Sequence, residues 1–409
     1  MAVASEWVEL YQDLHRHPEL SFQEHRTAGI VADRLLQLGF DVTRGVGETG
    51  VVGVLRSGEG PVVLLRADMD ALPVEEKTGL PYASTQRGTD AQGNDVPVAH
   101  ACGHDVHVTC LLAACAELAA SPDTWSGTLL AVFQPAEELG AGANAMVADG
   151  LFERFPKPVV VLGQHVAPLP GRVIGLHTGP TYAATDSMRV VLHGRGAHGS
   201  MPHASVDPVV MAAATVMRLQ TIVSREVSPA ETAVVTVGKL TAGTKANIIP
   251  DQAEIVLNIR TYSAEVRRTV IDAIKRIARG EAAASGAKVE PDFEVFDSLD
   301  IVVNDAAGVA RTLPALQAAG ASVIDPGPVP GSEDVGVLAI AAGAPCVYWM
   351  LGGADPGLFV GLTTVEQLVE LVVTLPSNHS PLYAPVVEPT LTIGTAALVS
   401  AAREWLRQT

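Results

Sequence analysis

The chain has 409 residues, of which 48% are hydrophobic and only 18% are charged. Because an ordinary domain holds roughly 100–200 residues, we expect two or three domains. Aromatic residues make up 4% of the chain and its formal charge is −18, which argues against the basic, aromatic surface of a nucleic-acid-binding protein. The composition is typical of a packed α/β enzyme, and the acidic balance is interpreted as a contribution to solubility.

The cysteines and the first residues bear on the compartment. Three of the four cysteines lie between positions 102 and 115, which is not the spaced framework of a secreted disulfide scaffold. Residues 1–10 include Glu6 and Glu9 and lack the basic and then apolar pattern of a signal peptide. No run of about 18 apolar residues is free of Gly, Pro and charge. We therefore expect a cytoplasmic protein that does not contact membranes.

The first seventy residues predict a helical layer followed by two strands. Apolar spacing over residues 5–38 predicts two helices, broken at His17-Pro18. The apolar runs 51–55 and 62–65 predict adjacent buried strands. Asp68 and Asp70 follow the second run, and sites in open α/β sheets form beyond the carboxyl ends of strands. Two acids at this place could equally cap a loop.

Residues 100–107, with the sequence HACGHDVH, form the densest group of potential metal ligands in the chain. Thiolate and neutral imidazole both suit Zn²⁺ and its first-row neighbours. A helix predicted over residues 108–120 would have its N-terminus at this segment, and its dipole would favour a thiolate at Cys102. A polar turn at the start of a helix remains the alternative interpretation.

Two further strands, predicted over residues 128–133 and 159–163, also end in polar side chains. The first leads to Glu137 and Glu138, and the second to His165. Taken singly, the glutamates could be a surface pair and the histidine a hydrogen-bonded structural residue. Because the carboxyl ends of parallel strands lie at one edge of a sheet, the repetition predicts a common site.

The pattern changes near residue 185. Segments 188–193, 232–240 and 253–262 alternate like half-buried strands, and helices are predicted over 208–223 and 264–285. We therefore predict a small α+β domain at 185–297, inserted into a larger domain formed by 1–184 and 298–409. In the last part we expect a strand over 346–351, few helices between 352 and 380, and a final Ala-rich helix.

Nine short motifs, in colinear order over nearly the whole chain, resemble the M20 metallopeptidase family. More narrowly they resemble its amidohydrolase branch, which includes hippurate hydrolases, N-acyl-amino-acid amidohydrolases and indole-acetyl-amino-acid hydrolases. The resemblance implies a zinc-peptidase-like α/β catalytic domain with a mostly parallel central sheet, plus an inserted ferredoxin-like lid and dimerisation domain. The motifs are LHRHPEL (14–20), RADMDALPV (66–74), HACGHDVH (100–107), QPAEE (134–138), GQHV (163–166), GAHGSMPH (196–203), ANIIPD (246–251), GSED (331–334) and NHSP (378–381).

The resemblance also implies a site with two divalent metal ions, which would be Zn, Mn or Co. Glu137 matches the general base, a carboxylate that takes a proton from the attacking water and later passes it to the leaving amine. Asp70 matches a carboxylate that orients a metal-binding imidazole. Asp68 stands where other branches carry a His ligand. The residues that match metal ligands are Cys102, His104, Glu138, His165 and His379.

Three residues of the inserted domain match further functional positions. His198 matches a histidine that stabilises the developing oxyanion, and relatives lend it to the partner's active site through a homodimer or larger assembly. Asn247 and Arg260 match positions that hold the carboxylate of the substrate. Val335-Gly336 departs from the family pattern, which has an aromatic residue after GSED, so the shape of the acyl pocket is undefined.

The predicted function is metal-dependent hydrolysis of an N-acyl-amino acid or a peptide-like small molecule. One alternative is a dipeptidase or aminoacyl-conjugate hydrolase on the same scaffold. A second is a thiol hydrolase in which Cys102 is the nucleophile. A third is a binding protein without chemistry, although a scaffold without activity would not need Glu137.

Overall fold

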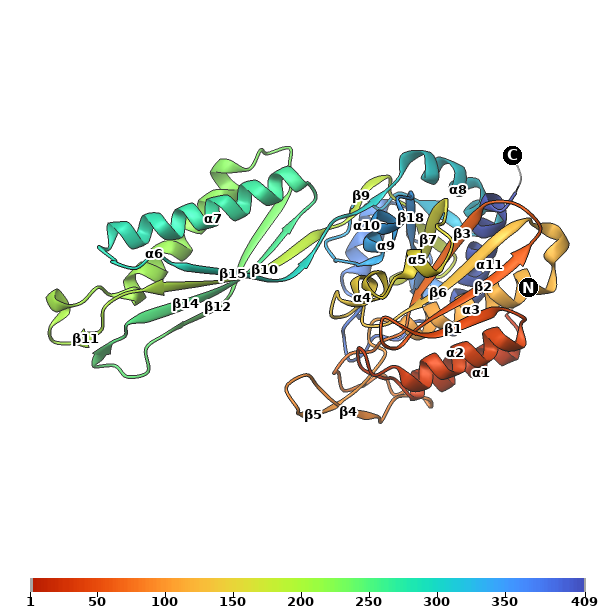
Figure 1. Ribbon diagram of the computed structural model, residues 1–409, viewed down its shortest axis with the longest axis horizontal. Helices are drawn as coiled ribbons and strands as arrows, with labels where there is room; N and C mark the ends of the chain where they lie inside the picture. The colour runs from red at the N-terminus through yellow and green to blue at the C-terminus, as the bar shows by residue number, and fades with distance from the viewer. Residues whose placement is uncertain (1–2, 408–409) are drawn as a thin grey trace. The chain divides into compact units, whose positions relative to one another are not determined.

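The computed structural model describes residues 3–407, and the chain divides into two compact units (Figure 1). The large unit comprises Met1–Gly179, Val303–Gly327 and Asp334–Thr409. The small unit comprises Pro180–Val302 and Pro328–Glu333. The sequence placed the inserted domain at 185–297, whereas the small unit begins five residues earlier and ends five residues later, and it also takes the short segment 328–333.

A ten-stranded mixed sheet forms the centre of the large unit. Strands β6, β3, β7 and β18 are parallel to one another, and β1 and β2 continue the sheet as antiparallel strands. This confirms the predicted mostly parallel sheet. From one edge, the strand order is β1 (Asp41–Val46), β2 (Gly50–Ser57), β6 (Gly127–Gln134), β3 (Val62–Asp68), β7 (Val160–Pro170), β18 (Cys346–Ala354), β16 (Val302–Asn304) and β9 (Gly179–Tyr182). Strand β8 (Val173–Gly175) pairs with β18, and β17 (Ser322–Ile324) pairs with β8.

The predicted adjacency of the two first buried strands is wrong, because β6 lies between β2 and β3. The connection from β2 to β3 runs against the start of β6, where the N–H of Thr128 donates to the carbonyl of Pro61 at 2.8 Å. Gly127 makes this approach possible: its φ is +121°, and a Cβ atom there would lie 2.2 Å from the Pro61 oxygen. The apolar runs predict strands but carry no information on which strand is inserted between them.

Helices cover both faces of this sheet. On β3 the side chains of Val63 and Leu65 belong to the main core, and Leu64, which points to the other face, is also fully buried. One helical group contributes to the main core, and α4 and α9 pack on each other and against β6 and β7. The helices that contribute to the main core are α1 (Ser5–Arg16), α2 (His25–Gln37), α3 (His104–Ala120), α8 (Ala306–Ala318) and α11 (Val387–Trp405). The other helices are α4 (Gly142–Ala148), α5 (Leu151–Arg154) and α9 (Val335–Ala342).

The remaining elements of the large unit are short. A hairpin of β4 (Arg87–Thr89) and β5 (Asp95–Pro97) precedes the HACGHDVH segment. The region between 352 and 380 contains a 3-10 turn at Pro356–Phe359 and the helix α10 (Val365–Val372), which begins with a capping box at Thr364. Across residues 3–407, every helix is either too short or too polar to cross a bilayer.

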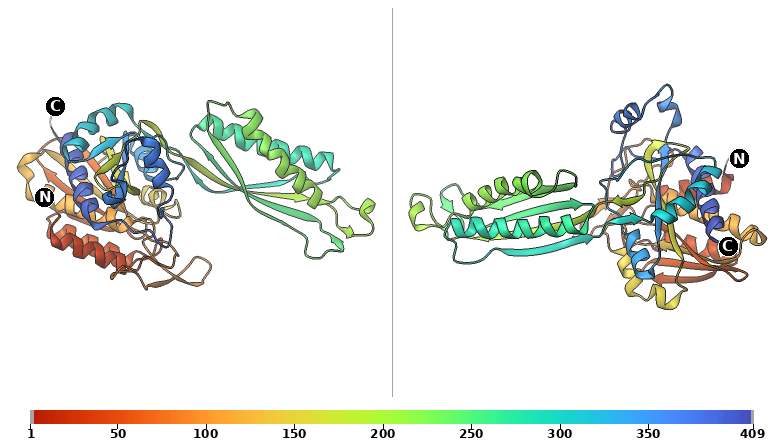
Figure 2. Two further views of the ribbon diagram at one scale, coloured as in Figure 1. Left: turned by 180° about the vertical axis from the view of Figure 1, so that it is seen from behind. Right: turned by 90° about the horizontal axis from the view of Figure 1, so that it is seen from above.

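The small unit has the order β10, α6, β12, β14, α7 and β15, which is the β-α-β-β-α-β order of a ferredoxin-like unit. Its antiparallel sheet runs β12-β14-β10-β15, and α6 and α7 pack side by side on one face (Figures 1 and 2). Alternate residues of β10, such as Met188 and Val190, are buried under these helices. The bounds are β10 (Ala184–His193), α6 (Pro208–Thr221), β12 (Ala233–Ala242), β14 (Gln252–Thr261), α7 (Ala264–Ala284) and β15 (Asp292–Leu299).

Candidate metal centre

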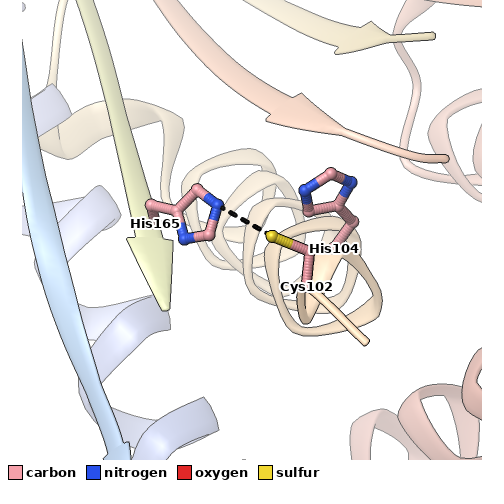
Figure 3. A group of neighbouring side chains, drawn as sticks. All are labelled: Cys102, His104 and His165. Carbon is pink, nitrogen blue, oxygen red and sulfur yellow. Dashed lines mark hydrogen bonds between the residues drawn. The ribbon is translucent and has the colours of Figure 1, made fainter. Parts of the chain in front are cut away.

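The five candidate metal ligands all lie in the large unit, on segments far apart in the sequence. Cys102 and His104 flank the start of α3, Glu138 follows β6, His165 lies in β7, and His379 lies in the loop after α10. The Sγ atom of Cys102 is 3.5 Å from Nε2 of His165, and Nε2 of His379 is 3.3 Å from a carboxylate oxygen of Glu138. Figure 3 shows Cys102 between the two imidazoles of His104 and His165. The structure therefore brings these five side chains together.

Gly103 shapes the backbone between Cys102 and His104. It precedes the first residue of α3 and has a left-handed φ of +86°. A Cβ atom at this position would lie 2.4 Å from a methyl group of Val166 in β7. A glycine is required on both grounds, and it allows the Cys-x-His turn to sit directly against the strand that carries His165.

Asp70, in the loop after β3, holds two parts of the centre in place. Its carboxylate accepts hydrogen bonds from Nδ1 of His104 at 3.2 Å, from the backbone N–H groups of Glu137 and Glu138 at 3.1 and 3.0 Å, and from the hydroxyl of Ser21 at 2.6 Å. Burial alone would raise the pKa of Asp70, but the hydrogen bond and charge of His104 outweigh burial and hold that pKa below its usual value. One buried carboxylate thus orients an imidazole and the neighbouring glutamate loop.

Two buried polar atoms face the centre without a hydrogen-bond partner among residues 3–407. They are Nε2 of His104 and Oε1 of Glu138. The other ring nitrogen of His104 is bonded to Asp70, and Nδ1 of His165 donates to the carbonyl of Val166 at 2.8 Å, so that Nε2 of each ring faces inward. Metal-ligating histidines are held in this way by a second hydrogen bond. Because unpaired buried polar atoms are costly, this set of S, N and O donors fits divalent metal ions.

The charges of these groups also fit a cation. Burial, assisted by the charge of Glu138, raises the pKa of the Cys102 thiol well above its usual value. In the protein alone, burial therefore sets the net direction of this pKa, and the predicted contribution of the helix N-terminus stays a prediction. Burial also raises the pKa of Glu138 to about 7, with a further contribution from Asp70. A nearby divalent cation would favour the ionised form of both groups.

His107 and Asp68 lie beside the centre but have other partners. Nδ1 of His107 bonds to the carboxylate of Asp68, and its Nε2 accepts the backbone N–H of Val166 at 2.8 Å. Both ring nitrogens are therefore engaged within the protein. Asp68 also accepts a hydrogen bond at 2.6 Å from the buried guanidinium of Arg66. These contacts give both ring nitrogens of His107 a partner within the protein and link Asp68 to the backbone of β7.

A second buried polar group lies near the first turn of α3. Nδ1 of His15 is 2.6 Å from the carboxylate of Asp105, and its Nε2 is 3.1 Å from Glu76. Burial lowers the pKa of His15, but the two carboxylates outweigh burial and raise it to about 10. Both partners of this imidazolium lie far from it in the sequence. The two contacts of His15 therefore connect α1 and the loop at Glu76 to the segment that carries His104.

Sequence reasoning gave no role to Ser21, His15 or Asn378. The first two lie in or directly after the motif LHRHPEL, and Asn378 directly precedes His379 in NHSP. Their positions within motifs were the available signal. Their contacts, however, are made with residues distant in the sequence, so no local pattern could identify their partners.

The structure groups the three small-unit candidates into two places. His198 in β11 (Ala197–His198) pairs with Ile248 of β13 (Ile248–Ile249), and the N–H of Gly199 donates to the carbonyl of Asn247 at 2.8 Å. Arg260 is near the opposite end of β14, where its guanidinium donates to the Pro330 carbonyl at 2.7 Å. From Gln252 to Arg260 a strand spans about 27 Å at about 3.4 Å per residue.

Comparisons with known proteins agree with this geometry. Residues 64–363 match the model of peptidase family M20/M25/M40. The chain is 40% identical over 314 residues to the hippurate hydrolase of Campylobacter jejuni, covering 75% of this chain and 79% of that one. It is 38% identical over 323 residues to the N-acetyl-L-cysteine deacetylase of Bacillus subtilis, covering 78% and 74%. A crystal structure from Bacillus subtilis, described as a dinuclear metal binding peptidase from the M20 family, has a TM-score of 0.80 at 29% identity, with 98% of each chain covered.

Proposed function

The chain belongs to peptidase family M20/M25/M40 and is a metal-dependent amidohydrolase, and from this premise we propose that it hydrolyses the amide bond of N-acyl-amino acids. One observation carries the proposal. Cys, His and Glu donors face inward, with Nε2 of His104 and Oε1 of Glu138 buried and without a hydrogen-bond partner among residues 3–407, and the buried carboxylate of Glu137 lies beside them. The names of the two curated relatives, both of which denote acyl-amino-acid hydrolysis, support the substrate class.

Cys102, His104, Glu138, His165 and His379 would hold two divalent metal ions, which we propose to be Zn, Mn or Co. When bound, such ions lower the pKa of water and polarise the carbonyl of the substrate. The description of the Bacillus subtilis neighbour as dinuclear supports the number of ions. The donor set itself, with one thiol, imidazoles and a carboxylate, supports a borderline metal more than Mg²⁺ or Ca²⁺.

Glu137 is the proposed general base and then the general acid. Its backbone is fixed by Asp70, and its carboxylate lies 3.7 Å from Nε2 of His104. In this position it takes a proton from the attacking water as the oxygen adds to the acyl carbon. It then delivers the proton to the amide nitrogen as the carbon–nitrogen bond breaks, which gives a carboxylic acid and a free amino acid.

His198 is the proposed donor to the oxyanion. The backbone N–H of Ser200 donates to Nδ1 of His198 at 3.1 Å. In the neutral imidazole this bond requires the proton on Nε2, so the exposed nitrogen is a hydrogen-bond donor. The imidazole therefore presents the group that the tetrahedral intermediate needs.

Asn247 and Arg260 are the proposed ligands of the substrate carboxylate, and their separation within the small unit bears on how they bind it. His198 and Asn247 are neighbours, whereas Arg260 lies near the far end of β14, a strand that spans about 27 Å from Gln252 to Arg260. We propose that the two ends of the small unit serve different active sites in a homodimer, or a larger assembly, held through the small unit. His198 and Asn247 would then act in trans.

A dipeptidase or aminoacyl-conjugate hydrolase would use the same centre, and a thiol hydrolase would not need metal. Cys102 is a poor free nucleophile in this structure, because burial raises the pKa of its thiol. None of the four cysteines forms a disulfide bond, which supports a reducing compartment, and we propose the cytoplasm.

The test is an assay of acetyl-, benzoyl- and indole-acetyl-amino acids and of dipeptides, after chelation and after addition of Zn²⁺, Mn²⁺ or Co²⁺. We expect chelation to abolish hydrolysis and one of the metals to restore it on an N-acyl-amino acid. Activity that survives chelation but is lost on thiol alkylation would assign the reaction to Cys102 instead. Restored activity on dipeptides alone would replace the substrate class.

A further inference from the structure

We propose that Asn378 is a positioning residue that fixes the Cys102 turn against the end of β7, and so sets the place of the Cys102 thiol relative to His165. This inference rests on the proposed metal centre and deepens it. Asn378 is adjacent in sequence to the candidate ligand His379, so that one short segment would supply a ligand and also orient two others.

The contacts of the Asn378 carboxamide reach two ligand segments at once. Its Nδ2 donates to the carbonyl of Cys102 at 3.0 Å and to the carbonyl of Val166 at 3.1 Å, and it lies 3.8 Å from the Sγ atom of Cys102. The backbone N–H of His379 donates to the carbonyl of Ala101 at 2.7 Å. The loop that carries His379 is therefore bonded along the turn that carries Cys102.

The orientation of the amide follows from its acceptors. Both short contacts are made to carbonyl oxygens, so the NH₂ group must face them, since a flipped amide would place its oxygen against two oxygens. The two N–H groups are used by these carbonyls. The 3.8 Å contact to Cys102 Sγ therefore shares one of these two N–H groups with a carbonyl, and it places the positive end of that N–H dipole beside the sulfur.

The carbonyl of Val166 links Asn378 to a second candidate ligand. It accepts from Nδ1 of His165 at 2.8 Å as well as from Asn378, so one oxygen receives both donors. Loss of the Asn378 amide would leave the carbonyl of Cys102 without this donor. It would also break the link that Asn378 makes between the carbonyl of Cys102 and the carbonyl of Val166, which accepts from His165.

The test uses the full-length protein loaded with Co²⁺, because a cobalt–thiolate bond gives a near-ultraviolet charge-transfer band that reports the metal–sulfur geometry. We expect Asn378→Ala to weaken or shift this band. We also expect its Co²⁺ dissociation constant, measured against a competing chelator, to rise by about 10- to 100-fold, as for other residues that orient ligands. Asn378→Leu, which keeps a branched side chain of similar size, should behave in the same way if the alanine variant is too unstable.

Asn304 offers a matched control within the large unit. Its amide also bridges two backbone carbonyls, those of His177 and Tyr348, each at 2.8 Å, but neither belongs to a candidate ligand segment. Asn304→Ala should lower the melting temperature and leave the band and the dissociation constant unchanged. A general loss of stability is thereby separated from a change at the metal.

The outcomes separate this inference from the proposed function. An unchanged band and dissociation constant in both Asn378 variants, with a band in the parent protein that Cys102→Ser removes, would overturn only the role of Asn378. A parent protein whose band does not depend on Cys102 would overturn both that role and the ligand set. Failure to hydrolyse N-acyl-amino acids, with the cobalt results as expected, would overturn only the substrate class.

Discussion

The functional candidates of the two units are held in opposite ways. In the large unit, Asp70 and His104 are fully buried, and hydrogen bonds from several segments fix them. In the small unit, His198 and Asn247 are exposed beside the short β11-β13 pair, and the hydrogen-bond partners of the His198 ring both belong to Ser200. The large unit presents a centre that is already formed, whereas the β11-β13 region presents exposed groups that are available to contact another surface.

The proposed mechanism requires this difference, because the large unit would hold the metal ions and move protons while His198 would act in the partner subunit. Groups that hold metal ions and move protons need fixed geometry, and buried hydrogen bonds provide it. A group that reaches into another chain must be exposed on its own chain. The comparison therefore predicts that mutations in the large unit act on metal and chemistry within one subunit, while mutations in the β11-β13 region act between subunits.

The largest effect that leaves the metal in place is expected for Glu137→Gln. The variant keeps the shape of the side chain but cannot take a proton, so kcat should fall by about 10²- to 10⁴-fold. Metal content, measured by elemental analysis, should equal that of the parent protein. Glu138→Gln is the matched control in the next residue, and it should lose metal as well as activity. Turnover unchanged in Glu137→Gln would remove this residue from the mechanism.

A smaller loss, of about 10²-fold in kcat, is expected for His198→Ala, because one donor to the oxyanion is removed. Metal content should not change. His203→Ala, at an exposed histidine of the same segment, is the control and should have nearly full activity.

Mixing His198→Ala with Glu137→Gln sharpens the comparison of the two units. In a homodimer with action in trans, each mixed dimer has one complete site, so random exchange should restore about a quarter of the parent activity. Subunit exchange is confirmed separately with differently tagged chains. If exchange is complete and activity stays absent, His198 acts within its own chain.

Asp70→Ala should weaken metal binding by about 10- to 100-fold, since His104 and the glutamate loop would lose their common acceptor. Ser21→Ala is the matched control, because it removes one hydrogen bond to Asp70 and leaves those of His104, Glu137 and Glu138. Competition with a chelator measures both. Equal dissociation constants for Asp70→Ala and the parent protein would show that the centre does not depend on this carboxylate.

The smallest effect on catalysis is expected for His15→Asn, which should instead reduce the free energy of unfolding by about 3 kcal/mol near neutral pH, because two buried carboxylates lose their cation. The pKa of His15 is raised to about 10 in the folded protein, against about 6.5 in an unfolded chain. The stabilisation of the folded protein by the charged His15 is therefore complete below pH of about 6.5 and is lost as the pH rises towards 10.

Denaturant unfolding at several pH values checks this prediction. The difference in stability between the parent protein and His15→Asn should shrink steadily above pH of about 6.5. His17→Asn is the control, since His17 is partly exposed and pairs with Asp13 at the surface. A difference that is constant up to pH of about 10 would show that His15 is neutral in the folded protein.

The sequence predicted the class of fold because strand and helix periodicities are local. The parallel strands after residue 62 and the alternating strands of the small unit were predicted from such local periodicities. β15 escaped prediction because the alternation that begins Asp292–Leu299 is broken after four residues and the strand is mostly exposed. The position of β6 between β2 and β3 escaped it because strand order depends on contacts between distant segments.

The same limit applies to the site. His104, Glu138 and His165 stood out because their chemistry is unusual at the ends of buried segments. The bonds of Asp70 to the glutamate loop could not be foreseen, since they require β3 and β6 to be neighbours. Asn378 carries no charge and has no distinctive spacing, and its partners are the carbonyls of Cys102 and Val166, which every residue possesses.

The bond between the His379 N–H and the carbonyl of Ala101 has a consequence for the order of events during synthesis. The Cys102 turn leaves the ribosome long before residue 379, and the whole small unit is translated between them. Domains generally fold as units while the chain is made, so the small unit can fold while the metal centre still lacks a strand neighbour, β18, and its last ligand. A nascent chain halted before the NHSP segment should therefore bind metal weakly, and loading would be a late event in the life of the protein.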